Sequence, residues 1–153
     1  MNRFCLLILS LALVLWGQDG KPNFSGTWDL QVAKSDFGPL PAPESQTHTI
    51  EHKDPKLKMT TASKGAQGDF TIERNLTTDG VEASYQAQER PWKTKVRRVE
   101  KTLVLEHEFE LEGNKIQIKD TWSLADDGKA LQSERVLNSS FGEANQKLVF
   151  TKK

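Results

Sequence analysis

Polar and apolar residues alternate with a period of two along almost the whole chain after residue 23. This alternation is typical of β-strands that bury one face, and no stretch of ten or more residues repeats with the period of a helix. The pattern therefore predicts an all-β protein. Its approximate strands are 24–33, 45–53, 56–62, 69–77, 81–87, 92–99, 102–111, 115–125, 129–137 and 145–152.

Short polar turn signals separate these strands. They lie at Asp54-Pro55, Gly65 to Gly68, Asp79-Gly80, Glu100-Lys101, Gly113-Asn114 and Asp127-Gly128. About ten short antiparallel strands joined by tight turns form an up-and-down meander, which has two exposed edges unless it closes. We therefore expect a closed β-barrel, with a strongly curved, partly open sheet as the alternative.

The segment 34–45, KSDFGPLPAPES, is the one long irregular connector in this pattern. Pro39, Pro41 and Pro43 make it stiff and extended rather than helical. A simple link between two strands is the preferred interpretation. A lid across one end of the barrel is the alternative.

The stretch 106–122, EHEFELEGNKIQIKDTW, carries one ionisable residue on the apolar face of each of its two strands. A two-residue turn at Gly113-Asn114 places His107 directly opposite Asp120. The turns on either side extend this row, with Thr94 opposite His107 and Arg135 opposite Asp120. The apolar neighbours form two further rows, which are Trp92, Phe109, Ile118 and Leu137, and Val96, Leu105, Trp122 and Ser133.

This polar row is self-consistent, because the carboxylate of Asp120 can accept hydrogen bonds from both His107 and Arg135. An isolated buried charge is very costly, whereas a paired and hydrogen-bonded charge is tolerated. The row therefore predicts a group of polar side chains turned toward the interior.

A second polar group is predicted in the first half of the chain. A turn at Asp79-Gly80 places Arg74 opposite Tyr85. A turn at Asp54-Pro55 places His48 opposite Thr61 and Ile50 opposite Met59. Arg74, Tyr85 and His48 would then share apolar faces with their neighbours.

The first residues differ in character from the rest of the chain. Arg3 is followed by an apolar run from Phe4 to Trp16, which is short for a transmembrane helix and fits the core of a signal peptide. We expect a signal peptide over 1–20, cleaved after Gly17 or Gly20, and a single domain over 21–153. An uncleaved anchor is the alternative. The expected location of the mature protein is secreted or periplasmic.

The position of the single cysteine and the balance of charges exclude some classes of function. The only cysteine, Cys5, lies in the leader, so the rest of the chain has no disulfide or thiol nucleophile. The chain has 21 basic and 21 acidic residues, and loss of Arg3 leaves 20 against 21. This balance does not indicate the basic surface that nucleic-acid binding requires. The most basic stretch, 93–98, divides its charges between the two faces of a strand.

The stretch from Phe24 to Trp28, FSGTW, resembles the opening Phe-x-Gly-x-Trp of the lipocalin and fatty-acid-binding-protein superfamily, the calycins. The resemblance rests on Gly26 and Trp28 and extends, in pattern, to small secreted bacterial lipocalin-like proteins of unknown function. It implies that this segment begins the first strand of a lipocalin-like or fatty-acid-binding-like barrel. It also implies that Trp28 closes one end.

The chain departs from the calycin pattern in three places. A Pro-rich connector replaces the helix–turn–helix of fatty-acid-binding proteins, and no helix is predicted near the C-terminus. The late Arg-x-Tyr of fatty-acid-binding proteins is replaced by Arg135-Val136-Leu137. The resemblance implies that Arg135 packs on Trp28, as a late Arg does in lipocalins. The alternative role for Arg135 is to anchor a ligand.

The favoured functional hypothesis is the binding of a small apolar or amphipathic ligand inside the barrel. The predicted contact residues are Arg135, His107, Asp120, Thr94, Trp92, Trp122, Phe109, Arg74 and Tyr85. A non-catalytic structural or interaction domain with a filled core is the alternative. We expect no cofactor and no stable membrane insertion once the leader is removed. The sequence leaves the oligomeric state open.

Enzymatic and metal-binding functions have less support in the sequence. The pair His107 and Asp120 resembles an oriented general base, but Thr94 is the only hydroxyl predicted beside it, and no Gly-x-Ser-x-Gly occurs. We therefore do not expect an enzyme, and a hydrolase is the least favoured function. His48 and His52 share a strand face two pleats apart, without cysteines to complete a metal site.

Overall fold

The computed structural model describes residues 20–153, so the expected signal peptide lies outside the described residues except for Gly20. All ten predicted strands are present. They are β1 (Gly26–Leu30), β2 (Ser45–Lys53), β3 (Lys56–Lys64), β4 (Phe70–Thr77), β5 (Ala83–Ala87), β6 (Arg90–Val99), β7 (Thr102–Leu111), β8 (Asn114–Ala125), β9 (Ala130–Ser139) and β10 (Gly142–Lys152).

The helical content of the described chain is two single turns of 3₁₀ helix. These are η1 (Val32–Lys34), in the long connector, and η2 (Asp126–Gly128), between β8 and β9. Among residues 20–153, no helix has the length and apolar character needed to cross a membrane.

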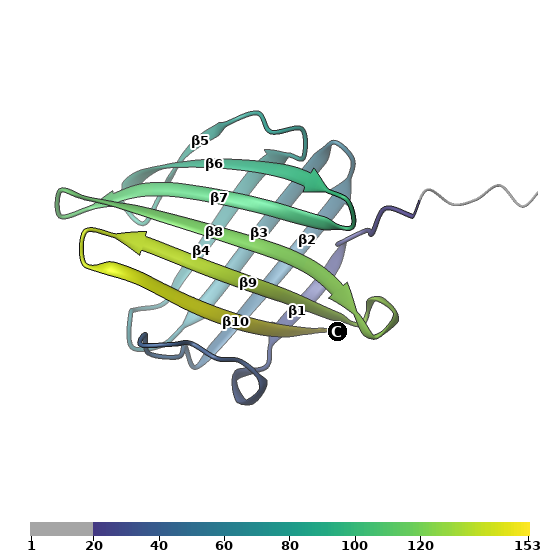
Figure 1. The fold of residues 1–153 in the computed structure, drawn as a ribbon, viewed down its shortest axis with the longest axis horizontal. Coiled ribbons are helices and arrows are strands. Elements are labelled where there is room, and N and C mark those ends of the chain that lie inside the picture. The colour runs from purple at the N-terminus through teal and green to yellow at the C-terminus, as the bar shows by residue number, and fades with distance from the viewer. Residues whose placement is uncertain (1–19) are drawn as a thin grey trace, which may run out of the picture.

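The strands form one antiparallel sheet in the order β4-β3-β2-β1-β10-β9-β8-β7-β6-β5. Strands β6 to β10 cross in front of β2 to β4 in Figure 1, so the sheet wraps round on itself. The edge strands β4 and β5 then meet without a ladder between them, and we call this junction the seam. The prediction of an up-and-down barrel is confirmed, and the barrel is nearly closed rather than fully hydrogen-bonded.

The seam corrects the predicted hairpin at Asp79-Gly80. The connection between β4 and β5 is longer than two residues, and it pairs with β6 instead, through an isolated bridge between Asp79 and Arg97. The amide of Gly80 donates to the carbonyl of Val96 at 2.9 Å. The prediction that β4 and β5 pair as ladder partners is therefore wrong.

The turn between β7 and β8 also differs from the prediction. Its two central residues are Glu112 and Gly113, with φ of 51° and 77°, and this double positive φ is characteristic of a type I′ hairpin. Leu111 therefore pairs with Asn114, and the register moves by two residues relative to the one expected. His107 lies opposite Ile118, and the prediction that it lies directly opposite Asp120 is wrong.

The two-residue shift also changes the predicted apolar rows. Phe109 pairs with Ile116 rather than Ile118, and Leu105 pairs with Asp120 rather than Trp122. A shift of two residues keeps every side chain on its predicted face, because the side-chain period of a strand is two. The polar residues therefore still point inward.

Three other predicted registers are confirmed. Between β6 and β7, Thr94 pairs with His107. Between β8 and β9, Asp120 pairs with Arg135. Between β2 and β3, His48 pairs with Thr61.

The largest apolar cluster fills one end of the barrel, which we call the base. Its most deeply buried side chains, each at most 2% exposed, include Phe24, Trp28, Leu57, Leu103, Leu105, Trp122, Leu131 and Phe150. The indole nitrogen of Trp28 donates to the carbonyl of Phe24 at 2.9 Å. The expectation that Trp28 lies in a closed end of the barrel agrees with this burial.

The Gly-x-Trp motif has a packing explanation at the base. Gly26 has φ of 140°, and a Cβ at this position would lie 2.5 Å from Cε of Lys152. The Lys152 ammonium lies over the Trp28 ring, 5.4 Å from its centroid. Lys152 therefore covers Trp28, and the expected packing of Arg135 on this ring is wrong.

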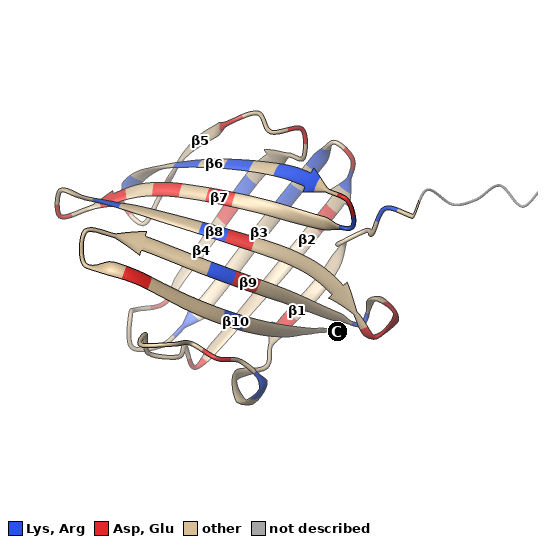
Figure 2. Cartoon of the chain, viewed as in Figure 1, with Lys and Arg blue, Asp and Glu red and all other residues tan. Residues whose placement is uncertain are grey.

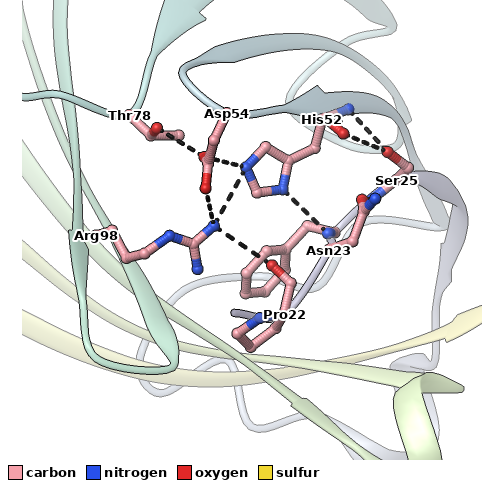
Figure 3. A network of polar contacts seen from close by, with 8 residues as sticks. Pro22, Asn23, Ser25, His52, Asp54, Thr78 and Arg98 are labelled. Atoms are coloured by element: carbon pink, nitrogen blue, oxygen red, sulfur yellow. Dashed lines mark hydrogen bonds and ion pairs between the residues drawn. The ribbon is translucent and has the colours of Figure 1, made fainter. Parts of the chain in front are cut away.

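A polar cluster ties the N-terminal segment to the base (Figure 3). The carboxylate of Asp54 accepts from His52 at 2.7 Å and from Arg98 at 2.9 Å. The Nδ1 atom of His52 accepts from the amide of Phe24 at 3.2 Å, and Arg98 also donates to the carbonyl of Pro22 at 3.4 Å. These contacts hold residues 22–24 against the barrel and join β2 to β6 across the seam.

Charged residues of both signs are interspersed along the strands in Figure 2. On β6, Lys93, Lys95 and Arg97 are exposed, while Thr94 and Val96 between them are buried. Three of the four charges in the stretch 93–98 therefore share the outer face, and only Arg98, whose side chain is 13% exposed, lies on the inner one.

Candidate functional site

A cavity of about 270 Å³ opens inside the barrel at the end opposite the base. Its apolar wall includes Met59, Phe70, Ile72, Trp92, Phe109, Ile118, Trp122, Leu137 and Leu148. Its polar wall includes Gln46, His48, Thr61, Ser63, Arg74, His107, Asp120, Arg135 and Gln146. The inward faces of strands on both sides of the seam therefore contribute to one site.

The long connector contributes residues to the mouth of this cavity. Phe37, Leu40, Pro41, Ala42 and Pro43 all line it. The connector therefore lies over one end of the barrel, and the preferred interpretation as a simple link is corrected in favour of the lid. We call residues 35–44 the strap.

Both ends of the strap are attached to the barrel. At one end, the backbones of Asp36 and Lys147 pair, and the side chain of Gln146 donates to the carbonyl of Phe37 at 3.0 Å. At the other end, the amide of Glu44 donates to the carbonyl of Lys64 at 2.9 Å. The prolines between these attachments supply no amide donors.

The inward polar residues form one connected chain around the barrel, which we call the polar belt. It consists of Gln46, His48, Thr61, Arg74, Tyr85, Thr94, His107, Asp120 and Arg135. Every strand from β2 to β9 supplies at least one member. The belt therefore continues through the seam, where the backbone ladder is interrupted.

On the first side of the seam, the belt runs through β2, β3 and β4. His48 Nδ1 lies 3.0 Å from the hydroxyl of Thr61. Arg74 Nη1 donates to the same hydroxyl at 3.1 Å. Arg74 Nε donates across the seam to the hydroxyl of Tyr85 at 3.0 Å.

On the second side, the belt continues from Tyr85 to β9. The Tyr85 hydroxyl lies 2.8 Å from the hydroxyl of Thr94, which lies 2.9 Å from Nδ1 of His107. Nε2 of His107 lies 3.5 Å from Oδ2 of Asp120. Arg135 donates to both Asp120 oxygens, at 2.6 and 3.0 Å.

From Arg74 to Asp120, the donors and acceptors of the belt have one consistent assignment. A guanidinium only donates, so the hydroxyls of Tyr85 and Thr61 accept from Arg74 and keep their own hydrogens for the next member. Thr94 then donates to Nδ1 of His107, whose Nε2 hydrogen faces Asp120. This assignment makes His107 a neutral imidazole between a hydroxyl and a carboxylate.

The pKa values of the buried histidines agree with that assignment. Burial, together with the positive charges of Arg135 and Arg74, lowers the pKa of His48 from 6.5 to about 3. Burial also lowers the pKa of His107, although the hydrogen bond and charge of Asp120 oppose this shift. Both imidazoles are therefore neutral at neutral pH.

Asp120 remains ionised although it is only 1% exposed. Burial by itself raises the pKa of this carboxyl, but the charge of Arg135 and the hydrogen bonds from His107 and Arg135 lower it below its usual range. The pKa of Arg135 is correspondingly raised, because the attraction of Asp120 outweighs the effect of burial. Asp120 and Arg135 thus form a neutral pair.

Arg74 has a different electrostatic environment. It is 7% exposed, and its hydrogen-bond partners are the neutral hydroxyls of Thr61 and Tyr85. Within residues 20–153 it forms no ion pair with a carboxylate. With the histidines neutral and Arg135 paired, Arg74 gives the cavity wall an uncompensated positive charge.

Most of the predicted contact residues come together in the cavity wall. Arg74, Trp92, His107, Phe109, Asp120, Trp122 and Arg135 line it. Tyr85 and Thr94 do not line the cavity. Instead, Tyr85 forms a hydrogen bond with Arg74, and Thr94 forms one with His107. Whether the lining residues contact a ligand remains a prediction.

Sequence reasoning missed part of the site. Thr61 and Ser63 line the cavity from β3, and alternation with Leu57 and Met59 is the signal that could have identified both, although the predicted strand ended at residue 62. The residues of the strap were also missed, because no local pattern indicates which distant strands an irregular connector covers.

The group formed by Thr94, His107 and Asp120 resembles a nucleophile–base–acid arrangement, but its geometry does not favour catalysis. Thr94 is 1% exposed and lies behind the cavity wall, and Tyr85 also occupies its hydroxyl. A nucleophile has to reach the substrate, so this hydroxyl is poorly placed to attack a molecule in the cavity. Within the described chain, no group of three or more His, Cys, Asp and Glu residues could hold a metal ion.

Comparison with solved structures places the barrel among known folds. The structure matches a secretory abundant heat soluble protein from Ramazzottius varieornatus with a TM-score of 0.62 and 16% identity, covering 84% of this chain and 94% of that chain. It matches a zebrafish ileal bile acid-binding protein with a TM-score of 0.56 and 12% identity, covering 85% and 98%. Human cRBP IV gives a TM-score of 0.54 and 16% identity, covering 86% and 99%.

These likenesses show the fold, which is an all-β barrel of the lipocalin and fatty-acid-binding type. At such low identities they establish neither a family nor a ligand. No protein-family model matches the sequence, and no curated protein matches it.

Proposed function

We propose that this protein binds a small amphipathic molecule in the barrel cavity. The observation that carries the proposal is the cavity of about 270 Å³, which combines an apolar wall with the buried, incompletely paired Arg74. Ligand sites in proteins commonly combine apolar walls with a few fixed polar groups in this way. Trp92 and Phe109, stacked 4.0 Å apart, offer a surface for the apolar part of the ligand.

Two of the structural neighbours support this choice of function. The zebrafish protein is described as a bile acid-binding protein complexed with cholic acid. Another neighbour, with a TM-score of 0.50, is a fatty-acid-binding protein from Echinococcus granulosus. Both are named for small amphipathic ligands, and this similarity supports a binding role without identifying the ligand.

The cavity also bears on the alternative of a structural domain with a filled core. Apolar side chains pack densely at the base, whereas the upper half of the barrel leaves a space larger than a few water molecules would occupy. A domain whose only role was structural would gain stability from filling that space. The binding hypothesis accounts for the cavity and for the polar side chains that face it.

The first test is a titration of residues 21–153 with the neutral fluorescent probe N-phenyl-1-naphthylamine, together with native mass spectrometry of the purified protein. We expect saturable binding of one probe molecule. The substitution Ser63→Trp should abolish this binding, because Ser63 is 7% exposed and faces the cavity, so an indole would occupy the ligand's space.

The matched control is Ala62→Trp, which adds the same indole to the exposed face of the same strand. It should leave probe binding unchanged. Equal effects of the two substitutions, or no saturable binding by the wild type, would contradict a ligand-binding cavity.

A further inference from the structure

We propose that the cavity selects ligands that carry a single negative charge, which Arg74 binds, and that Asp120 excludes a second negative charge by neutralising Arg135. This inference rests on the proposed function, because it requires the cavity to bind small molecules. Beyond the proposed function, the ligand is assigned one negative charge, and Arg74 and Asp120 are assigned the selection.

The buried wall of the cavity carries unequal numbers of positive and negative charges. Two cations, Arg74 and Arg135, and one anion, Asp120, face the cavity. His48 and His107 are neutral, so the wall carries one excess positive charge. A charge buried away from water is stabilised by a partner of opposite sign. A ligand with one negative charge would supply that partner.

The charged group of the ligand would lie against the Arg74 guanidinium. Nε and Nη1 of Arg74 donate to Tyr85 and Thr61, which fixes the plane of the guanidinium. Within the described chain, Nη2 of Arg74 makes no hydrogen bond, so its hydrogens remain for a ligand. Ile72, two residues earlier on the same face of β4, also lines the cavity and offers apolar contact beside this group.

The second cation, Arg135, already has a carboxylate partner. Arg135 is held by Asp120 in a two-point contact, with Nε at 2.6 Å and Nη2 at 3.0 Å from the carboxylate oxygens. Asp120 is also fixed by His107 and by the hydroxyl of Ser133, which lies 3.4 Å away. A second negative charge on the ligand would have to displace this carboxylate or remain unpaired beside it.

Lys64 is the remaining charged residue of the cavity lining, and it provides a control. Its side chain is exposed at the mouth, where solvent weakens its interaction with a bound anion. Removing this charge by Lys64→Gln should have little effect on the selection between ligands.

The experiment compares three competitors with the same ten-carbon chain for their ability to displace N-phenyl-1-naphthylamine at pH 8. Decanol is neutral, decanoate carries one negative charge, and decyl phosphate carries about two, since the second pKa of a phosphate monoester is near 6. For the wild type, we expect decanoate to bind about tenfold or more tightly than either of the others, a difference of about 1.4 kcal/mol.

Two variants assign the selection to its residues. Arg74→Gln should remove the advantage of decanoate over decanol while the neutral probe still binds. Asp120→Asn removes the negative charge without changing the side-chain shape, and it should improve the binding of decyl phosphate relative to decanoate by about tenfold. Lys64→Gln should keep the order of the wild type.

The outcomes separate the two proposals. Failure of the probe to bind the wild type would overturn the proposed function and this inference with it. Probe binding with equal affinities for the three competitors would overturn only the charge selection, and so would a wild type that binds decyl phosphate as tightly as decanoate. If Arg74→Gln fails to fold, the response of Asp120→Asn decides between selection and no selection.

Discussion

At the scale of single residues, the charged groups that face the cavity differ in how they are paired. The carboxylate of Asp120 accepts from Arg135 and faces His107, so this charge is balanced inside the barrel. Arg74 is held by two neutral hydroxyls and has no carboxylate partner among the described residues. The difference between these two arginines follows from the position of one carboxylate.

The lowered pKa of His48 predicts that the free energy of unfolding depends on pH. Its pKa in the folded barrel is about 3, against 6.5 in an unfolded chain. Below pH 6.5 the unfolded state takes up a proton that the folded state does not, so the stability present above this pH is lost progressively as the pH falls toward 3. The wild type should therefore lose about 1 kcal/mol per pH unit more than His48→Gln between pH 6 and 4.

Urea unfolding of both proteins at pH 7, 6, 5 and 4 measures this difference. His107 acts in the same direction, but it is present in both proteins and cancels. Equal slopes of unfolding free energy against pH would show that His48 takes up its proton equally in both states.

At the scale of elements, the β7–β8 turn determines how the belt is assembled. Glu112 and Gly113 form the turn, so His107 and Asp120 are diagonal rather than opposed, and their side chains still meet at 3.5 Å. Diagonal neighbours on one sheet face remain within reach of long side chains. The shift therefore preserves the contact that a directly opposed pair would have made.

The conformation of Glu112 predicts a stabilising substitution. Its φ of 51° lies in the left-handed region, which costs a residue with a Cβ about 1 kcal/mol or more, and which Asn tolerates better. Glu112→Asn should raise the free energy of unfolding by about 0.5–1 kcal/mol, measured by urea denaturation. Glu110→Asn, an exposed position in the β7 strand, is the control.

The control should not gain stability, because Asn is a poor strand former. A gain at Glu110 equal to that at Glu112 would mean that the effect comes from charge or solubility rather than from the turn.

At the scale of the whole molecule, the seam between β4 and β5 is closed by side chains. The hydroxyl of Tyr85 accepts a hydrogen bond from Arg74 Nε on the other side of the seam. The Arg74 guanidinium also lies 5.8 Å from the Tyr85 ring centroid. Near the base, Asp79 pairs with Arg97 and the Asp54–Arg98 ion pair spans the same junction. The barrel therefore depends on the polar belt for part of its closure.

The seam predicts a local effect of Tyr85→Phe. Removing the hydroxyl leaves Arg74 Nε without its acceptor while keeping the ring, so we expect a loss of about 1–3 kcal/mol. Hydrogen exchange should accelerate first in β4 and β5 and last in β8 and β9, which are paired on both sides. Thr60→Val, which removes a hydroxyl from the outer face of β3, is the control and should leave this pattern unchanged.

Uniform acceleration across all strands in Tyr85→Phe would mean that the barrel opens only as a whole. No change in β4 and β5 would mean that the hydroxyl does not contribute to the closure of the seam.

The sequence by itself determined the strands, their order along the chain and the face on which each polar residue lies. These features are local, because the period of two assigns a face to each residue and tight turns join successive antiparallel strands. His107, Asp120 and Arg135 could therefore be predicted as one inward group, although the β7–β8 register was wrong by two residues. Such a shift leaves the faces unchanged, so alternation alone could not detect it.

Only the tertiary structure decided where the sheet closes, what covers the cavity and which arginine pairs with a carboxylate. Arg74 and Tyr85 meet because the sheet curves until its two edge strands adjoin, and no hairpin pattern encodes that approach. The strap reaches the mouth through contacts with Gln146 and Lys64, which are distant in sequence. These arrangements depend on packing between remote segments, and such packing leaves no periodic signal in the chain.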